Sequence, residues 1–245
     1  MPQNIFDNDI FFNGYKSLRE NPRCKNNTIE KPALFSLIPD LSGKSVLDLG
    51  CGFGENCAEF IEMDAKSVCG VDLSEKMLNE AKLRFGGRGI DFIRGDMNDL
   101  SGIRGNFDIV LSSLAVHYVK DFSKLAREVY AMLENGGYFI FSQEHPLNTA
   151  PEEDEVFTYD ENNNARHYNL ANYSVSGLRR VNWFVDGIEK YHRTFSDIIN
   201  LLVAAGFKIE KMLEPIPCDD EIACDNSLRE HLHRPLFLLI KARRT

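Results

Sequence analysis

Short, mostly apolar runs alternate along the middle of the chain with amphipathic stretches. The runs lie at 45–49, 67–71, 90–94, 107–111 and 138–142. Runs of this kind are typical of buried parallel strands, and the stretches between them repeat apolar residues at helical spacing. Strands that alternate with helices predict an α/β fold with a parallel sheet and right-handed crossovers.

The stretches between the strands carry helix start and stop signals. Ser74 and Ser196 are favourable N-caps for two of the helices, and Gly136 predicts the end of another. Two further strand-like runs close the chain at 207–213 and 236–242. We expect these two runs to pair with each other at one side of the sheet.

Two segments fall outside this alternation. The first forty residues are polar and interrupted by prolines, which predicts a helical arm over residues 1–40. Residues 144–193 begin with an acidic, asparagine-rich stretch and end in two strand-like runs. We expect this second segment to be an inserted lid that contacts the substrate. The remaining residues, 41–143 and 194–245, would then form one continuous core.

The strand-like runs at the end of the insertion surround the dipeptide Asp186-Gly187. Asp-Gly between two such runs is a strong hairpin signal, because both residues tolerate the backbone angles of a tight turn. The simplest register pairs Val185 with Ile188. The sequence therefore predicts a β-hairpin in the lid with its turn at Asp186-Gly187.

Composition and charge narrow the classes of function. Hydrophobic residues make up 43% of the chain and charged residues 27%, as in soluble globular proteins, and no apolar run reaches the length of a membrane span. The N-terminus shows no signal-peptide pattern, so we expect a cytoplasmic protein without a membrane partner. The formal net charge of −9 disfavours binding to long DNA or RNA. The six cysteines show no zinc-site spacing, so we expect free thiols and no metal.

A glycine-rich turn follows the first predicted strand, in the sequence VLDLGCGFGE that ends at Glu55. Glycines at such a turn let a ligand approach the backbone closely. The dinucleotide fingerprint G-x-G-x-x-G needs a glycine where this chain has Glu55, and a carboxylate there is unfavourable for a pyrophosphate. A cofactor with an ammonium and a sulfonium group suits Asp48 and Glu55 better. Charge alone therefore favours S-adenosylmethionine over a nicotinamide dinucleotide.

Two more acidic residues follow the next two predicted strands. Asp72 lies about 20 residues after the glycine loop, where a carboxylate accepts hydrogen bonds from ribose hydroxyls. Asp96 follows the third strand and is placed to accept from an adenine amino group. Each of these residues has a structural alternative as a turn or helix-capping residue. Together they predict one site, because ligands of open parallel sheets bind at the carboxyl ends of the strands.

The motifs VLDLGCGFGE, GVDLS, GDMNDL and FDIVLSSLAVHYV together resemble the successive motifs of class I S-adenosylmethionine-dependent methyltransferases, and most closely the bacterial branch that acts on small molecules. The resemblance covers residues 45–143 well and the last helix and two strands more loosely. It implies a Rossmann-like, seven-stranded, mostly parallel sheet with helices on both faces and an antiparallel last strand. It also implies S-adenosyl-L-methionine as cofactor and S-adenosyl-L-homocysteine as product.

By position, the resemblance also implies a set of cofactor-binding residues. The arm residues Tyr15 and Arg19 are four apart, so one helix face can present both to the cofactor's carboxylate, and a solvated amphipathic helix is the alternative. The remaining residues implied are Asp48, Gly50, Cys51 and Gly52 for the methionine portion, Asp72 for the ribose, Leu73 and Met77 near the adenine, Asp96 and Met97 at the adenine edge, and Ser112 and Ser113 near the methyl group.

Methyl transfer from a sulfonium is an in-line displacement in which the protein mainly supplies alignment. A general base helps only where the acceptor must lose a proton. The candidate catalytic groups are His117 after strand four and His145 with its neighbour Glu144 after strand five. The candidates for substrate contact are His145, Tyr173, Trp183 and His192. The aromatic lid residues predict a satellite core or a pocket for a flat acceptor, whereas the acidic lid residues suit a cationic amine.

We therefore expect an enzyme, a monomer or homodimer, that methylates O or N of a small-molecule acceptor. Methylation of RNA or protein is one alternative, and the acidic balance counts against RNA. A nicotinamide oxidoreductase is a second alternative, which Glu55 disfavours. A non-catalytic S-adenosylmethionine-binding protein is a third, and nothing in the sequence excludes it, because this chemistry needs no invariant catalytic residue.

Overall fold

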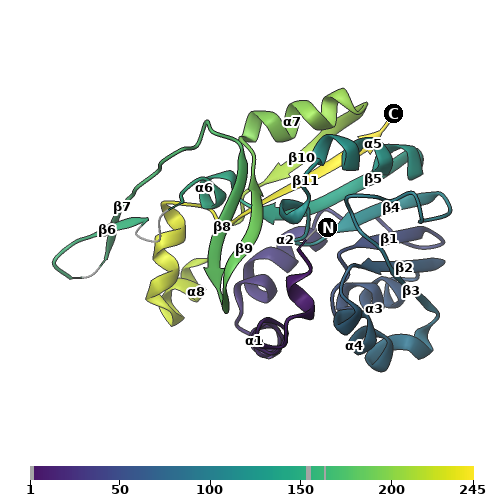
Figure 1. Ribbon diagram of the computed structural model, residues 1–245, viewed down its shortest axis with the longest axis horizontal. Coiled ribbons are helices and arrows are strands. Elements are labelled where there is room, and N and C mark those ends of the chain that lie inside the picture. Colours follow the sequence, from purple (N-terminus) through teal and green to yellow (C-terminus); the bar gives the residue numbers. More distant parts are fainter. Residues whose placement is uncertain (1–2, 153–155, 163) are drawn as a thin grey trace.

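The centre of the molecule is a seven-stranded sheet (Figure 1). The computed structural model describes residues 3–152, 156–162 and 164–245. The strand order is β10-β11-β5-β4-β1-β2-β3; β11 runs antiparallel to both of its neighbours, and the other neighbouring strands are parallel. The predicted α/β class, seven strands and antiparallel last strand are confirmed. The strands are β1 (Ser45–Leu49), β2 (Ser67–Asp72), β3 (Ile90–Arg94), β4 (Phe107–Ser112), β5 (Leu133–Glu144), β10 (Phe207–Leu213) and β11 (Phe237–Arg244).

Helices cover both faces of the sheet, as predicted. One face packs on α5 and α7, and the other packs on α2, α3 and α4. Strand β1 shows how the two cores divide, because Leu47 and Leu49 belong to the first core and Val46 to the second. No helix in the described part of the chain is long and apolar enough to cross a membrane. The helices are α1 (Asp9–Glu20), α2 (Lys31–Phe35), α3 (Glu55–Glu62), α4 (Glu75–Phe85), α5 (Phe122–Met132), α6 (Pro146–Thr149), α7 (Phe195–Ala204) and α8 (Asp219–Cys224).

Two local boundaries differ from the expected ones. Thr194 caps α7 instead of Ser196: its hydroxyl accepts a hydrogen bond from the Asp197 amide (3.1 Å), and the Asp197 carboxylate accepts from the Thr194 amide (3.3 Å). This reciprocal capping box satisfies two backbone donors at once, which a cap at position 196 would not. Strand β5 begins at Leu133, earlier than expected, because Gly136 (φ 82°) is accommodated within the strand, beside an irregularity in the β4–β5 pairing.

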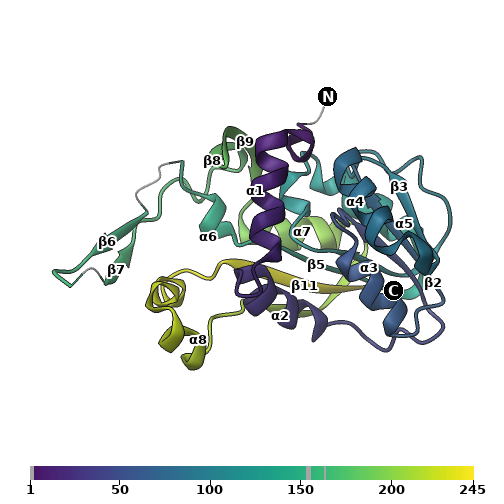
Figure 2. The same ribbon diagram turned by 90° about the horizontal axis from the view of Figure 1, so that it is seen from below.

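Residues 144–193 add two hairpins that lie outside the seven-stranded sheet, although Glu144 itself is the last residue of β5. Strands β6 (Phe157–Tyr159) and β7 (Ala165–Tyr168) form a short hairpin that projects from the body of the molecule (Figures 1 and 2). Strands β8 (Gly177–Trp183) and β9 (Val185–His192) form a longer hairpin beside the N-terminal helix α1 (Figure 2).

The predicted turn of the β8–β9 hairpin is wrong. Val185 pairs with Trp183 rather than with Ile188, so the chain turns at Phe184, and Gly187 lies inside β9. Phe184 has a φ of 58°, a left-handed conformation that is strained for a bulky side chain. Contacts outside the hairpin must therefore favour this turn over the local Asp-Gly signal.

Helix α1 supplies those contacts. The ring centroids of Trp183 and Phe184 lie 5.4 and 5.6 Å from that of Phe11, both edge-on. Gly14, one turn further along α1, allows this approach, since a Cβ there would lie 2.7 Å from the Phe184 ring. Aromatic packing on a distant helix thus sets the hairpin turn, and it holds the hairpin against the arm.

Candidate functional site

A cavity of about 460 Å³ opens at the carboxyl ends of strands β1 to β4. The glycine loop and the segments after β2, β3 and β4 form its floor and walls, while Gln3 to Phe6 and two residues of β9 border it from the other side. Most of the predicted cofactor-binding residues line it: Tyr15, Gly50, Gly52, Asp72, Leu73, Met77, Asp96, Met97 and Ser113.

The glycines of the loop are needed for two different reasons. Gly50 and Gly52 both adopt positive φ angles, 75° and 53°. A Cβ at Gly50 would lie 2.4 Å from the Cβ of Ala115, so the protein itself fills that space. A Cβ at Gly52 would meet no described atom within 4 Å, although Gly52 lines the cavity. A side chain there would enter the space that a ligand needs.

Asp72 ties the glycine loop to the end of β2. Its Oδ2 accepts a hydrogen bond from the Gly52 amide (2.9 Å), and its Oδ1 accepts from the Ser74 amide (2.8 Å). Burial raises the pKa of this carboxyl above its usual value. Ser74 is the predicted N-cap of α4, and its hydroxyl accepts from the Met77 amide (3.1 Å). Loop, strand end and helix start therefore form one rigid unit along the cavity.

Asp48 and Cys51 lie behind the cavity wall. Asp48 is 1% exposed, its Oδ2 accepts a hydrogen bond from the Cys57 thiol (3.3 Å), and its Oδ1 has no partner among the described residues. Burial raises the pKa of Asp48 to about 7. The backbone amide of Cys51 donates to the carbonyl of Val71 (3.0 Å). A buried carboxylate oxygen without a partner beneath the loop fits a ligand that brings a cationic group.

The two serines after β4 have different surroundings. Ser112 is buried, and its hydroxyl donates to the carbonyl of Leu49 (2.8 Å), so it joins β4 to β1. Ser113 lines the cavity, and its hydroxyl donates to the buried carboxyl of Glu30 (2.9 Å). Of the pair, only Ser113 borders the ligand space.

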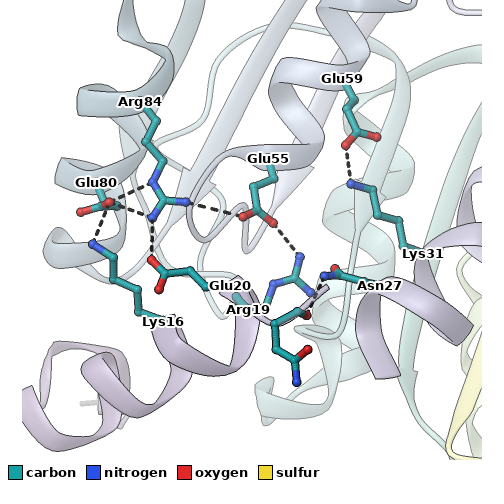
Figure 3. Close-up of polar contacts among 10 residues, drawn as sticks. Lys16, Arg19, Glu20, Asn27, Lys31, Glu55, Glu59, Glu80 and Arg84 are labelled. Carbon is teal, nitrogen blue, oxygen red and sulfur yellow. Dashed lines mark hydrogen bonds and ion pairs between the residues drawn. The ribbon is translucent and has the colours of Figure 1, made fainter. Parts of the chain in front are cut away.

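Ion pairs join α1 to the glycine-loop side of the core (Figure 3). Glu55, the first residue of α3, contacts Arg19 at 2.7 Å and Arg84 at 3.6 Å. Glu80 contacts Lys16 at 3.0 Å and Arg84 at 2.8 Å. The Glu55 carboxylate, expected to favour a cofactor ammonium, is thus already matched by two arginines. Arg19 is held beside the loop but does not line the cavity.

The first described residues cross the cavity as an N-terminal strap, Gln3 to Asp7. At one end the Gln3 amide group accepts from the backbone of Glu189 and donates to the carbonyl of Gly187, each at 2.9 Å. At the other end the Asp7 carboxylate accepts from the hydroxyl of Ser74 (2.6 Å). The strap therefore links the β8–β9 hairpin to the start of α4 and roofs the cavity.

Aromatic rings line the roofed part of the cavity. The Phe6 ring of the strap lies edge-on to Tyr15 and Tyr118, with centroids 5.3 and 5.8 Å apart. Burial raises the pKa of Tyr15 to about 12 and raises that of Tyr118 well above its usual value. Both phenols therefore stay protonated near neutral pH.

The predicted catalytic residues lie beside the cavity without lining it. His117 is buried: its Nδ1 accepts from the Glu144 amide (3.4 Å), its Nε2 lies 3.8 Å from the Glu144 carboxylate, and burial lowers its pKa to about 4. The Lys190 ammonium donates to the same carboxylate. These contacts join the lid hairpin to the end of β5.

His145 is similarly engaged with its own surroundings. Its Nδ1 accepts from the Leu147 amide (3.1 Å), which makes it the N-cap of α6, and its Nε2 lies 2.7 Å from the Glu214 carboxylate. Burial lowers the pKa of His145. The ring thereby joins α6 to the segment after β10.

The other residues expected to contact substrate also have internal partners. His192 donates through Nε2 to the carbonyl of Tyr173 and accepts at Nδ1 from the Thr149 hydroxyl, each at 2.8 Å. The Tyr173 hydroxyl accepts from the Phe195 amide (3.0 Å). The Trp183 ring packs on α1, as described above. None of these side chains lines the cavity.

Two residues of β9 also line the cavity: Tyr191, one of the aromatic lid residues considered for an acceptor pocket, and Glu189, which the sequence reasoning did not single out. The residues that alternate with them, Ile188, Lys190 and His192, are buried. Successive side chains of a strand point to opposite faces, so Glu189 and Tyr191 share the other face of the hairpin. The alternation of side chains along β9 would predict these two cavity residues, but only once it is known which face of the strand is buried.

Comparison with known proteins shows to which family the chain is related. A family model described as a methyltransferase domain matches residues 47–141. An uncharacterized protein of Haemophilus influenzae is 39% identical, with 98% of this chain and 96% of that protein covered. The phthiotriol/phenolphthiotriol dimycocerosates methyltransferase of Mycobacterium tuberculosis is 34% identical over 44% of this chain and 41% of its own length.

Among solved structures, the S-adenosylmethionine-dependent methyltransferase of Mesorhizobium loti superposes with a TM-score of 0.80. It is 39% identical in sequence, and the match covers 88% of this chain and 97% of that one. The similarity thus includes the arm or the lid as well as the core, because the core residues 41–143 and 194–245 alone are too few to reach that coverage. With this likeness, the seven-stranded sheet and the glycine loop of its own in place, the chain belongs to the class I, Rossmann-like S-adenosylmethionine-dependent methyltransferases.

Proposed function

We propose that the roofed cavity binds S-adenosylmethionine and transfers its methyl group to a nitrogen or oxygen atom of a small molecule. The observation that carries this proposal is the space over Gly52, where the backbone lies open to the cavity beside the carboxylate of Asp72. When bound, the cofactor supplies a methyl group already activated on a sulfonium. The protein then needs to hold, align and shield the reactants.

Each part of the cavity wall has a task in this proposal. The open space over Gly52 admits the methionine portion, beside Gly50, and the unpartnered oxygen of Asp48 lies below it to balance its positive charge. Asp72 accepts hydrogen bonds from the ribose hydroxyls. Its carboxylate lines the cavity while it also accepts from the Gly52 amide of the loop. Asp96 and its neighbours border the position of the adenine.

The roof supports a small acceptor over a polymer. The N-terminal strap and the β8–β9 hairpin cover the cavity and are bonded to each other through Gln3. A nucleic acid or protein substrate would need an open face beside the reacting atoms, and the acidic balance of the chain opposes a polyanion. The acceptor is therefore enclosed between the roof and the cofactor.

Calorimetric titration with S-adenosylhomocysteine tests the proposal. We expect micromolar binding by the unaltered protein, no binding of NADH, and about 10-fold to 100-fold weaker S-adenosylhomocysteine binding by Asp72→Ala, which loses a hydrogen-bonding carboxylate. Asp91→Ala is the matched control, because Asp91 is an exposed carboxylate on β3 outside the cavity. Equal affinity of the Asp72 and Asp91 variants would contradict the cofactor assignment. Cofactor binding without turnover on any acceptor would leave a non-catalytic binder.

A further inference from the structure

Among the described residues that line the cavity, none is suited to remove a proton from a weakly acidic hydroxyl. No histidine is among the described residues that line it, because the rings at 117, 145 and 192 are bonded elsewhere. Tyr15 and Tyr118 stay protonated, since burial raises the pKa of both. Carboxylates are too weakly basic to deprotonate an alcohol, and they disfavour the anion that a phenol would form on losing its proton. This favours acceptors that are nucleophilic without such help, namely amines, carboxylates and thiolates.

Charge separates these three classes. The charged residues that line the cavity are three carboxylates, Asp72, Asp96 and Glu189, and one ammonium, that of the exposed Lys120. Asp72 accepts from two backbone amides, and Asp96 accepts from the Asn98 amide at 2.8 Å, on the cofactor side. A second anion beside these groups is disfavoured, whereas a cation gains from them. Carboxylate and thiolate acceptors are therefore less suited than amines.

Glu189 is the carboxylate on the acceptor side. Its Oε1 accepts from Arg180 at 2.9 Å, but the Arg180 side chain is 65% exposed and the Glu189 side chain 29% exposed. Ion pairs of this kind are worth little, because water screens them and competes for the charges. A ligand ammonium can therefore replace Arg180 as the partner of Glu189 at little cost in free energy, and the arginine then remains in solvent.

Aromatic rings surround the same end of the cavity. Tyr191 shares the cavity face of β9 with Glu189, two residues away. Phe6 of the strap and Tyr118 of the loop after β4 line the same cavity and lie edge-on to each other. Ring faces attract cations, and alkylammonium groups are bound in this way by aromatic cages closed with a carboxylate. An acidic and an aromatic residue of the lid, which the sequence suggested for different acceptors, thus line the same end of the cavity.

We propose that the acceptor is a primary or secondary amine, which binds as a cation against Glu189 and the rings of Tyr118 and Tyr191. This inference rests on the proposed function. The bound ammonium loses one proton to solvent water, in the same acid–base equilibrium that an amine has in free solution. The free nitrogen lone pair then forms the bond to the methyl carbon as the carbon–sulfur bond breaks. The sulfur keeps that electron pair, and the products are a methylated ammonium and S-adenosylhomocysteine.

Matched acceptor series test the proposal. Protein loaded with S-adenosylhomocysteine is titrated with phenethylamine, 2-phenylethanol and 3-phenylpropanoate, and with the corresponding indole and linear alkyl series. We expect the amine to bind at least about 10-fold more tightly than the alcohol and the acid in at least one series. Acids that bind as tightly as amines, or no amine binding up to about 10 mM in any series, would overturn the assignment. The affinity for S-adenosylhomocysteine, measured in the same titrations, reports separately on the proposed function.

Two variants locate the contact. Glu189→Gln should weaken binding of the preferred amine about 10-fold and leave S-adenosylhomocysteine affinity unchanged. Asp186→Asn, which changes an exposed carboxylate on the same strand, should alter neither. Equal amine binding by the two variants would refute the role of Glu189. With tyramine, which offers an amine and a phenol in one molecule, mass spectrometry should find the added methyl on nitrogen, and methylation of the phenol would overturn the proposal.

Discussion

Replacement of Asp48 by asparagine tests whether a charge is buried beneath the glycine loop. The Asp48 side chain is 1% exposed, and burial raises its pKa to about 7. In the unfolded chain an aspartate titrates near pH ~4, as ordinary carboxyl groups do. Between these two values the folded protein keeps a proton that the unfolded chain has lost. The contribution of Asp48 to the stability of the ligand-free protein therefore falls as the pH rises through this window.

The size of the effect follows from the two pKa values. A difference of about 3 in pKa corresponds to roughly 4 kcal/mol of unfolding free energy in total, of which roughly 2–3 kcal/mol falls between about pH 5 and pH 8. The carboxamide that Asp48→Asn introduces does not titrate, so the variant lacks this component. Its carbonyl oxygen can still accept from Cys57, and its unpaired amide group lowers stability by an amount that does not depend on pH.

Urea unfolding of both proteins without ligand, at about pH 5 and at about pH 8, measures this difference. Other titrating groups, such as His117, contribute equally to both proteins and cancel when the two are subtracted. We expect the Asp48→Asn variant to gain roughly 2–3 kcal/mol relative to the unaltered protein over this range. Free energies of unfolding that change in parallel with pH would show that Asp48 has an ordinary pKa in the folded state, and the argument for a buried, unmatched carboxylate would fail.

Three further sites give contrasting predictions. Gly50→Ala should lower the unfolding free energy by about 2–4 kcal/mol, because its Cβ would lie 2.4 Å from that of Ala115; a stability within about 0.5 kcal/mol of the original would contradict this packing. Gly52→Ala should lower it by only about 1–2 kcal/mol of backbone strain, yet weaken S-adenosylhomocysteine binding at least about 10-fold in calorimetry; unchanged affinity would mean that no ligand passes over this residue. His145→Ala removes the N-cap of α6 and should reduce stability by about 1 kcal/mol while sparing cofactor affinity, so a clear loss of affinity would place the ring at the cofactor.

The core and the cofactor end of the cavity were predictable because their signals are local. Each buried strand appears as its own apolar run, and β1, β2 and β3 are followed within a few residues by groups that line the cavity, such as Gly52, Asp72 and Asp96. Ser74 caps α4 through contacts within one turn of helix. Sequence patterns report such short-range relations directly.

The acceptor end was not predictable because its contacts join distant parts of the chain. The hairpin turn depends on Phe11 and Gly14, far from Phe184 in sequence. His145 is occupied by Glu214, a partner that no local pattern indicates. The choice of which face of β9 covers the cavity depends likewise on Lys190 reaching the end of β5. A histidine beside a predicted site therefore reveals its role only when its partners are known.

The bond between Gln3 and β9 has a kinetic consequence. It fastens the first described residues to a hairpin much later in the sequence, and the aromatic contacts of α1 with the tip of that hairpin fasten them a second time. Neither piece can swing away while the other stays in place, so we expect the two to separate from the core in a single cooperative event. Both products would then wait for the same opening, and the frequency of that opening, rather than the displacement at the methyl carbon, would set the upper limit on turnover.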